Sequence, residues 1–227
     1  MPDRFEPKLA VLPQSQRQLW PRLVPLRELG YVLYGGTAVA LHLGHRTSID
    51  FDFFRAEPMD KQDLLSELPF LRQAHTDQED KDTLVVMVGT PSGDVRVSFF
   101  GGIGFGRVND PLQTNDSVLL VASLDDLMAA ELKALLDRAE AKDYRDISAM
   151  LAAGVSLAKG LGAIAGMFGK DPVLPLRALG YFKDGDLATL PKADQDRLRK
   201  ARDGISSIPK VPIISGCLAV KASDCSP

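Results

Sequence analysis

The sequence has few of the residues that define disulfide-stapled, metal-bound or membrane-spanning proteins. Only two of its 227 residues are cysteine, Cys217 and Cys225, which excludes a disulfide framework or a Cys/His metal centre as the basis of the fold. We expect both to be free thiols. No apolar run approaches the roughly 20 residues that a membrane-spanning helix needs. Because the charged, proline-broken N-terminus also lacks a signal-peptide core, we expect a cytoplasmic protein with no membrane partner.

The chain also lacks an excess of charge of one sign. Its net charge is −3, so no global basic field indicates a nucleic-acid partner, although a local basic patch stays compatible with the composition. Hydrophobic residues make up 45% and charged residues 25%, which is ordinary for a globular domain. A chain of this length buries a substantial core, as one large domain or as a domain with an extension.

Hydrophobic periodicity predicts an α/β (α+β) fold with a mixed-sheet first half and a mostly helical second half. Strands are expected at 31–34, 48–54, 83–88, 95–100 and 118–121. Helices are expected at 14–30 (broken by prolines), 37–43, 59–68, 124–139, 142–152, 156–168 and 193–202. The two strands at 83–88 and 95–100 flank a Pro-Ser-Gly-Asp turn and should form an antiparallel hairpin.

The expected strand at 48–54 carries two aspartates in an otherwise apolar segment. The alternation places Ile49, Phe51 and Phe53 on one face, and Ser48, Asp50 and Asp52 on the other. Residues two apart on a strand lie about 6.6 Å from each other, so the two carboxylates can share divalent cations such as Mg²⁺. In nucleotidyl transfer such cations neutralise triphosphate charge and activate the attacking oxygen.

A paired glycine precedes this strand, at the junction of a short apolar strand and a helix. Gly35 and Gly36 have no side chains, so backbone N–H groups at the start of the helix can approach phosphates. Taken alone, the Asp-Phe-Asp triplet is explained more simply by solvated carboxylates beside an ordinary tight turn. The order of strand, Gly-Gly turn, helix and Asp-x-Asp strand is more informative than any single part.

That order resembles the core of the nucleotidyltransferase superfamily related to DNA polymerase β. More narrowly, the segment LYGGTAVALHLGHRTSIDFDFF resembles the AbiEii/AbiGii-type nucleotidyltransferase toxin family. The positions that carry this resemblance are Gly35, Gly36, Thr37, Ala38, His45, Arg46, Ser48, Asp50 and Asp52. The resemblance implies metal binding by Asp50 and Asp52, and nucleotide binding by Gly35, Gly36, Thr37, Arg46 and Ser48.

A second match lies in the expected helices, in the segment ELKALLDRAEAKDYRDI. It places Lys133, Arg138, Lys142, Asp143 and Asp146 at the family's lysine, arginine and K/R-D-x-x-D positions. By spacing alone, Asp143 and Asp146 share a helix face and Lys142 can pair with Asp146. An exposed, salt-bridged helix surface fits that spacing equally well. The resemblance implies that Lys133 and Asp146 are catalytic and that Lys142 and Asp143 bind nucleotide.

The resemblance thus implies a Mg²⁺-dependent nucleotidyltransferase that uses an NTP donor. It suggests an RNA acceptor, with tRNA as one candidate, although protein hydroxyls are also used in the superfamily. A toxin of this group implies a cognate antitoxin partner in a toxin–antitoxin or phage-defence system. The corresponding domains are a nucleotidyltransferase core at 1–122, a helical region at 123–204 and an irregular tail at 205–227.

Two positions depart from the superfamily pattern. The first turn usually carries glycine-serine, whereas here it is Gly35-Gly36. The position that aligns with the third carboxylate is Ser98, and serine is neither a strong base nor a strong metal ligand. Asp94 lies four residues away, about 13 Å along a strand, too far for a simple substitution. The narrower family tolerates Gly-Gly, but Ser98 favours a second hypothesis, a catalytically weakened nucleotide-binding or interaction protein of the same fold.

Overall fold

A computed structural model describes residues 2–220 of the chain, which divide into two compact units. The first comprises the residues up to Gly106, Asp110–Ser123 and the stretch from Ser215 onward. The second comprises Arg107–Asn109 and Leu124–Ile214. The first unit holds the whole sheet and the second is helical, so the predicted fold class of a mixed sheet followed by a mostly helical half is confirmed.

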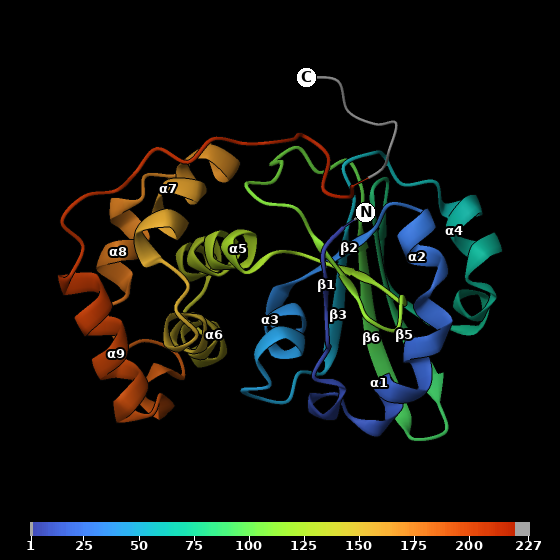
Figure 1. Cartoon of the computed structure of the whole chain (residues 1–227). Helices are drawn as coiled ribbons and strands as arrows, with labels where there is room; N and C mark the ends of the chain where they lie inside the picture. The colour runs from blue at the N-terminus through green and yellow to red at the C-terminus, as the bar shows by residue number, and fades with distance from the viewer. Residues whose placement is uncertain (1, 221–227) are drawn as a thin grey trace. The chain divides into compact units, whose positions relative to one another are not determined.

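The first unit is built on an eight-stranded mixed sheet of order β1-β7-β8-β2-β3-β6-β5-β4 (Figure 1). Three neighbouring pairs are parallel, β1–β7, β2–β8 and β3–β6, and the other four are antiparallel. The strands are β1 (Arg4–Phe5), β2 (Val32–Tyr34), β3 (Asp50–Phe54), β4 (His75–Asp80), β5 (Thr83–Thr90), β6 (Gly93–Phe100), β7 (Leu112–Thr114) and β8 (Leu120–Val121).

Strands β5 and β6 form the predicted hairpin, closed where Thr90 faces Gly93. The apolar residues of β6, Val95, Val97 and Phe99, are at most 1% exposed. Helix α1 packs against β5 and β6. The alternation of the sequence therefore selects the buried face of this hairpin, as period-2 patterning predicts.

Four short helices accompany the sheet: α1 (Gln14–Leu19), α2 (Pro25–Glu28), α3 (Gly35–Leu43) and α4 (Lys61–Glu67). In Figure 1, α3 lies on one side of the sheet, and α1, α2 and α4 lie on the other. The expected helix at 14–30 is interrupted by a 3₁₀ turn over Trp20–Leu23, which contains Pro21. Proline removes a backbone donor and disrupts a continuous helix, so the break follows directly from the sequence.

Three strands of the sheet, β1, β4 and β7, were not predicted. All six residues of β4 are exposed, and its sequence, HTDQED, has neither apolar alternation nor β-branched residues beyond one threonine. Strand β4 exists because it pairs with β5 at the edge of the sheet. Charged residues on such an edge also discourage pairing with another chain.

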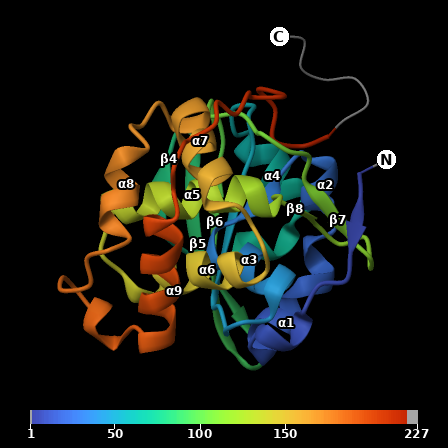
Figure 2. The same cartoon turned by 60° about the vertical axis from the view of Figure 1, so that its left-hand side comes forward.

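The second unit contains α5 (Leu124–Asp137), α6 (Ala141–Ala152), α7 (Leu157–Phe168), α8 (Val173–Ala178) and α9 (Lys192–Asp203). Helix α5 packs against α6, α7 and α8, and α6 also packs against α9 (Figure 2). Ser156 caps α7 by accepting a hydrogen bond from the Lys159 N–H at 3.3 Å. Helix α8 was not predicted, since Pro172 and Pro175 obscure its pattern.

The segment after α9 lies along α7. A methyl group on Gly162 would come within 2.1 Å of the Pro209 carbonyl oxygen, so only glycine permits this close approach. Further on, Cys217 is disulfide-bonded, which corrects the expectation of a free thiol there; Cys225 lies outside the described residues. Within residues 2–220, no helix is long and apolar enough to cross a membrane.

Candidate active site

The two aspartates of the Asp-x-Asp motif lie on one face of β3. Phe51 and Phe53 are fully buried on the opposite face, whereas Asp50 and Asp52 are half-buried. Antiparallel pairing places Asp52 opposite Tyr34, the last residue of β2 and the residue before the Gly-Gly turn. The carboxylates, the turn and the start of α3 therefore belong to one local structure.

Ile49 is a correction to the predicted face pattern. It was expected on the buried face with Phe51 and Phe53, but it precedes β3 and is 63% exposed. The alternation holds only from Asp50 onward, because residues outside the hydrogen-bonded ladder need not follow the pleat.

Gly35 opens α3 and lies against the Asp52 carboxylate. Its φ of +70° is a left-handed conformation that favours glycine. A Cβ placed on Gly35 would also lie only 3.2 Å from Asp52 Oδ2. Glycine is thus required here for two independent reasons. Gly36 follows it, and the N–H groups of this first turn belong to the set that an α-helix leaves without intrahelical partners.

Thr37 and Ser48 connect α3 to the start of β3 through buried hydroxyl groups. The two hydroxyl oxygens are 2.7 Å apart, and the Thr37 hydroxyl also hydrogen-bonds to the Asp50 carbonyl oxygen. Because a carbonyl can only accept, Thr37 donates to Asp50 and Ser48 donates to Thr37. These contacts indicate that Thr37 and Ser48 position Asp50, in addition to any nucleotide contact.

Ser98 lies directly opposite Asp52 on the parallel pair β3–β6. It is 3% exposed, so a buried hydroxyl stands where the superfamily pattern has its third acid. Asp94 is exposed and pairs with Gly89 near the hairpin turn. Within the described part of the chain, no three His, Cys, Asp or Glu residues are grouped so that they could hold a metal ion.

Two arginines accompany the carboxylates in the first unit. Arg96 is exposed and lies opposite Asp50 in the β3–β6 register, so it shares the face of the two aspartates. Arg46 is half-buried in the loop between α3 and β3, where its guanidinium donates to the Thr47 carbonyl oxygen at 3.1 Å. Both can supply positive charge to a bound phosphate.

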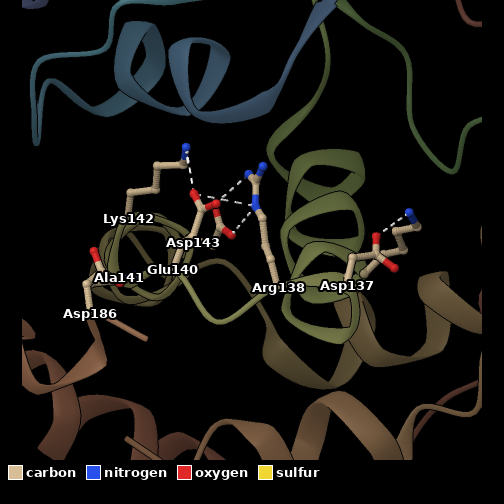
Figure 3. A network of polar contacts seen from close by, with 8 residues as sticks. Asp137, Arg138, Glu140, Ala141, Lys142, Asp143 and Asp186 are labelled. Carbon is tan, nitrogen blue, oxygen red and sulfur yellow. Dashed lines mark hydrogen bonds and ion pairs between the residues drawn. The ribbon is translucent and has the colours of Figure 1, made fainter. Parts of the chain in front are cut away.

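The second motif falls in α5 and α6 of the helical unit (Figure 3). Lys133 forms an i,i+4 ion pair with Asp137 on the exposed side of α5. Arg138 donates two hydrogen bonds to Asp143, at 2.8 and 3.0 Å. This bidentate contact is the main cause of the raised pKa of Arg138. Because the Asp143 side chain is only 2% exposed, the arginine compensates a buried carboxylate.

The spacing predicted that Lys142 pairs with Asp146, but in the structure Lys142 pairs with Glu140. Its ammonium nitrogen lies 2.7 Å from Glu140 Oε2, and this contact is the main cause of the lowered pKa of Glu140 (Figure 3). Asp146 is completely buried on the inner side of α6, whereas the Lys142 side chain is 48% exposed. The two residues are four apart in sequence but face different surroundings.

Sequence reasoning missed Asp126, a buried aspartate in the first turn of α5. Its two carboxylate oxygens accept hydrogen bonds from the backbone N–H groups of Val108 and Asn109, at 2.9 and 3.1 Å. It thereby ties the segment 107–109 to the helical unit. The acidic first turn was visible in the sequence, but its partners lie 17 and 18 residues earlier and could not be inferred from spacing.

The structure therefore brings Gly35, Gly36, Thr37, Ser48, Asp50 and Asp52 together in the first unit. Lys133, Lys142, Asp143 and Asp146 belong to the second. The roles that the resemblance implies for these four residues stay predictions.

Residues 24–209 match the sequence model of a known family, the nucleotidyl transferase AbiEii toxins of type IV toxin–antitoxin systems. The match includes both motifs and most of the helical unit. The chain belongs to the AbiEii family. The resemblance seen in the Gly-Gly and Asp-x-Asp segments is thus confirmed across both units.

One curated relative of this AbiEii protein is an uncharacterized protein of Aquifex aeolicus (strain VF5). The two are 28% identical over 139 residues, which cover 60% of this chain and 65% of the relative. The chain thus spans less than two thirds of that relative's length.

Two solved structures resemble the AbiEii chain in fold. A protein of H. pylori, described as a candidate nucleotidyltransferase, aligns with a TM-score of 0.52 and 18% identity over 83% of this chain and 92% of that one. MenT4, a nucleotidyltransferase toxin of Mycobacterium tuberculosis H37Rv, aligns with a TM-score of 0.56 and 16% identity over 85% of this chain and 83% of that one. Both support a nucleotidyltransferase fold.

Proposed function

We propose that this AbiEii-family protein is a Mg²⁺-dependent nucleotidyltransferase that moves a nucleotide from an NTP to an RNA or protein acceptor. The observation that carries the proposal is the Asp50–Asp52 face of β3 beside Gly35. Two carboxylates on one strand face, next to a helix start without side chains, suit a metal–triphosphate complex.

The residues of this face fit a magnesium ion. Because Gly35 has no side chain, nothing at that position crowds Asp52 Oδ2 or competes with a ligand for this carboxylate. Asp50 and Asp52 would hold the ion through oxygen atoms, which Mg²⁺ prefers. When bound, the ion neutralises charge on the triphosphate and lowers the barrier to attack.

The protein's own groups then bind and orient the nucleotide. The N–H groups of Gly35 and Gly36 face the phosphates at the positive end of the α3 dipole. Arg46 adds positive charge in the first unit. For Lys133 and Lys142 of the helical unit, which pair with Asp137 and Glu140, the family resemblance implies a catalytic and a nucleotide-binding role. Thr37 and Ser48 hold the backbone at Asp50, while Asp143 and Asp146 support the helices that carry the cations.

For the acceptor we favour RNA, with tRNA as one candidate, and we expect an antitoxin as the protein partner. Family membership supports the antitoxin, because the matched family is described as toxins of type IV toxin–antitoxin systems. Arg46 and Arg96 are the basic residues of the first unit that we expect near the acceptor backbone. A protein hydroxyl is the alternative acceptor.

A second function, nucleotide binding without efficient transfer, is favoured by Ser98. A serine opposite Asp52 removes the carboxylate that would bind metal or accept a proton from the acceptor. General-base help is typically worth about 10²–10⁴-fold in rate, so its loss could leave a binding protein with the same fold.

Incubation with each of the four labelled NTPs, Mg²⁺ and total RNA tests the two functions. Label transfer that Asp50→Asn abolishes supports the enzyme. Asp80→Asn is a matched control, since Asp80 is an exposed aspartate of the edge strand β4. Nucleotide binding without transfer to RNA or to protein supports the second function, and the absence of both contradicts the site.

A further inference from the structure

A cluster of aromatic rings continues the carboxylate face at the end of β3. Phe54 is two residues beyond Asp52 and therefore on the same face. Its ring stacks on Phe100 of the neighbouring strand, with centroids 4.8 Å apart, and meets the edge of Tyr34 at 5.4 Å. Phe105 completes the cluster, 5.7 Å from Tyr34 and 6.3 Å from Phe54.

A glycine-rich loop, residues 101–106, brings Phe105 back over the strand. The N–H of Gly102 donates to the Glu57 carbonyl oxygen at 2.8 Å, and the N–H of Ile103 donates to that of Arg55 at 3.1 Å. A Cβ on Gly101 would lie 2.6 Å from the Met59 backbone nitrogen. Glycine therefore lets the loop run close beside the segment that follows β3, and Phe105 comes to lie near Phe54.

These rings do not form a closed core. Phe51, Phe53 and Phe99, on the other face of the sheet, are fully buried. Phe54 and Phe105, in contrast, are only half-buried. Half-buried aromatic residues next to a carboxylate pair combine the apolar and polar groups that line ligand sites.

We propose that Phe54 and Phe105 form the surface on which the base of the NTP stacks. This inference rests on the proposed nucleotidyltransferase function. A nucleotide whose phosphates lie at Gly35 and Asp52 needs a platform for its base a short distance away. Phe54 is about 6.6 Å further along the same strand face.

The chemistry of phenylalanine adds a prediction about specificity. Phenylalanine rings stack on any base and have no hydrogen-bonding group with which to distinguish one base from another. The cluster should therefore increase affinity for all four NTPs and leave the choice among them to other groups.

Calorimetric titration of the full chain with Mg²⁺ and each NTP, compared with inorganic tripolyphosphate, tests this surface. Phe54→Leu keeps apolar volume but removes the aromatic face, and Phe54→Tyr restores it. Phe5→Leu is a matched control. Phe5 lies in the edge strand β1, is half-buried, and stacks on His42 of α3. We expect Phe54→Leu to weaken NTP binding by about fivefold to a hundredfold, with tripolyphosphate binding unchanged.

Several results would overturn the inference. Equal weakening of NTP and tripolyphosphate binding would show that Phe54 only supports the fold. If the wild-type protein binds tripolyphosphate as tightly as NTPs, the base adds no affinity. That result would contradict the stacking surface but still support the phosphate site. A protein that binds neither would contradict the proposed function itself. Unchanged NTP binding with a raised KM for RNA would assign the surface to the acceptor instead.

Discussion

Asp52 and Ser98 face each other across the parallel strands β3 and β6, so a carboxylate and a buried hydroxyl share one row of the sheet. Tyr34 extends that row on the other side of Asp52 and leads directly into the Gly-Gly turn. The site thus has two acids on one strand and a serine on the next. Its catalytic power depends on what Ser98 can supply.

Ser98→Asp should raise transfer activity by about 10²-fold or more, with NTP affinity roughly unchanged. The new carboxylate would act on the reacting oxygen more than on the bound triphosphate. Since Ser98 is buried, the variant should also be less stable without Mg²⁺ than with it. Transfer kinetics and NTP titration measure the two effects. If Ser98→Asp is inert while Asp94→Asn destroys activity, Asp94 is the third acid.

Gly35→Ala should abolish nucleotide binding and destabilise the fold. It combines a positive φ with a Cβ 3.2 Å from the Asp52 carboxylate. Gly169→Ala is the matched control, because Gly169 also has a positive φ, +61°, but no atom within 4 Å of an added Cβ. We expect the control to cost about 1–2 kcal/mol in unfolding free energy and to leave NTP binding intact. Equal NTP binding by both variants would argue against a phosphate site at this turn.

His42 should make the first unit less stable at acidic pH. Burial lowers the pKa of His42 to about 4, against 6.5 in the unfolded chain, and its Nε2–H donates to the Ala122 carbonyl oxygen at 2.9 Å. Between these two values the unfolded chain binds more protons, so stability is full above about pH 6.5 and falls as the pH drops toward 4.

The effect at full development is about 3 kcal/mol. Urea unfolding of wild type and His42→Gln at pH 7.5 and 4.5 isolates it, because the variant should lose less stability between the two values. His75→Gln serves as the control, since the His75 side chain is 80% exposed. Identical pH dependence of wild type and His42→Gln would contradict the assignment.

Arg138→Met should destabilise the helical unit by about 1–3 kcal/mol, because it leaves the buried Asp143 carboxylate without its bidentate partner. The half-exposed position of Arg138 keeps the effect below that of a fully buried pair. Lys192→Met is the control, since its pair with Asp196 is exposed and should contribute within about 0.5 kcal/mol. Chemical denaturation compares the two, and equal effects would mean that Asp143 is compensated by other groups.

The sequence by itself determined the local structure around the site. Alternation from Asp50 to Phe54 was enough to separate two carboxylates from two buried phenylalanines, because the period of two belongs to any strand. The Gly-Gly turn and the helix that ends at Gly44 follow from the conformations that only glycine adopts easily. These signals depend on neighbours in the chain and can be interpreted without the rest of the fold.

Only the tertiary structure decided which distant segments meet. Strand β4 forms through pairing with β5, despite an exposed, acidic sequence, and Ile49 is exposed because the ladder begins one residue later. The contacts of Phe105 with Tyr34 and Phe54, and the position of Ser98 opposite Asp52, join residues more than 40 apart. Such contacts depend on the register between strands and on the paths of loops. Register arises when two distant segments pair, so the sequence of either segment alone does not specify it.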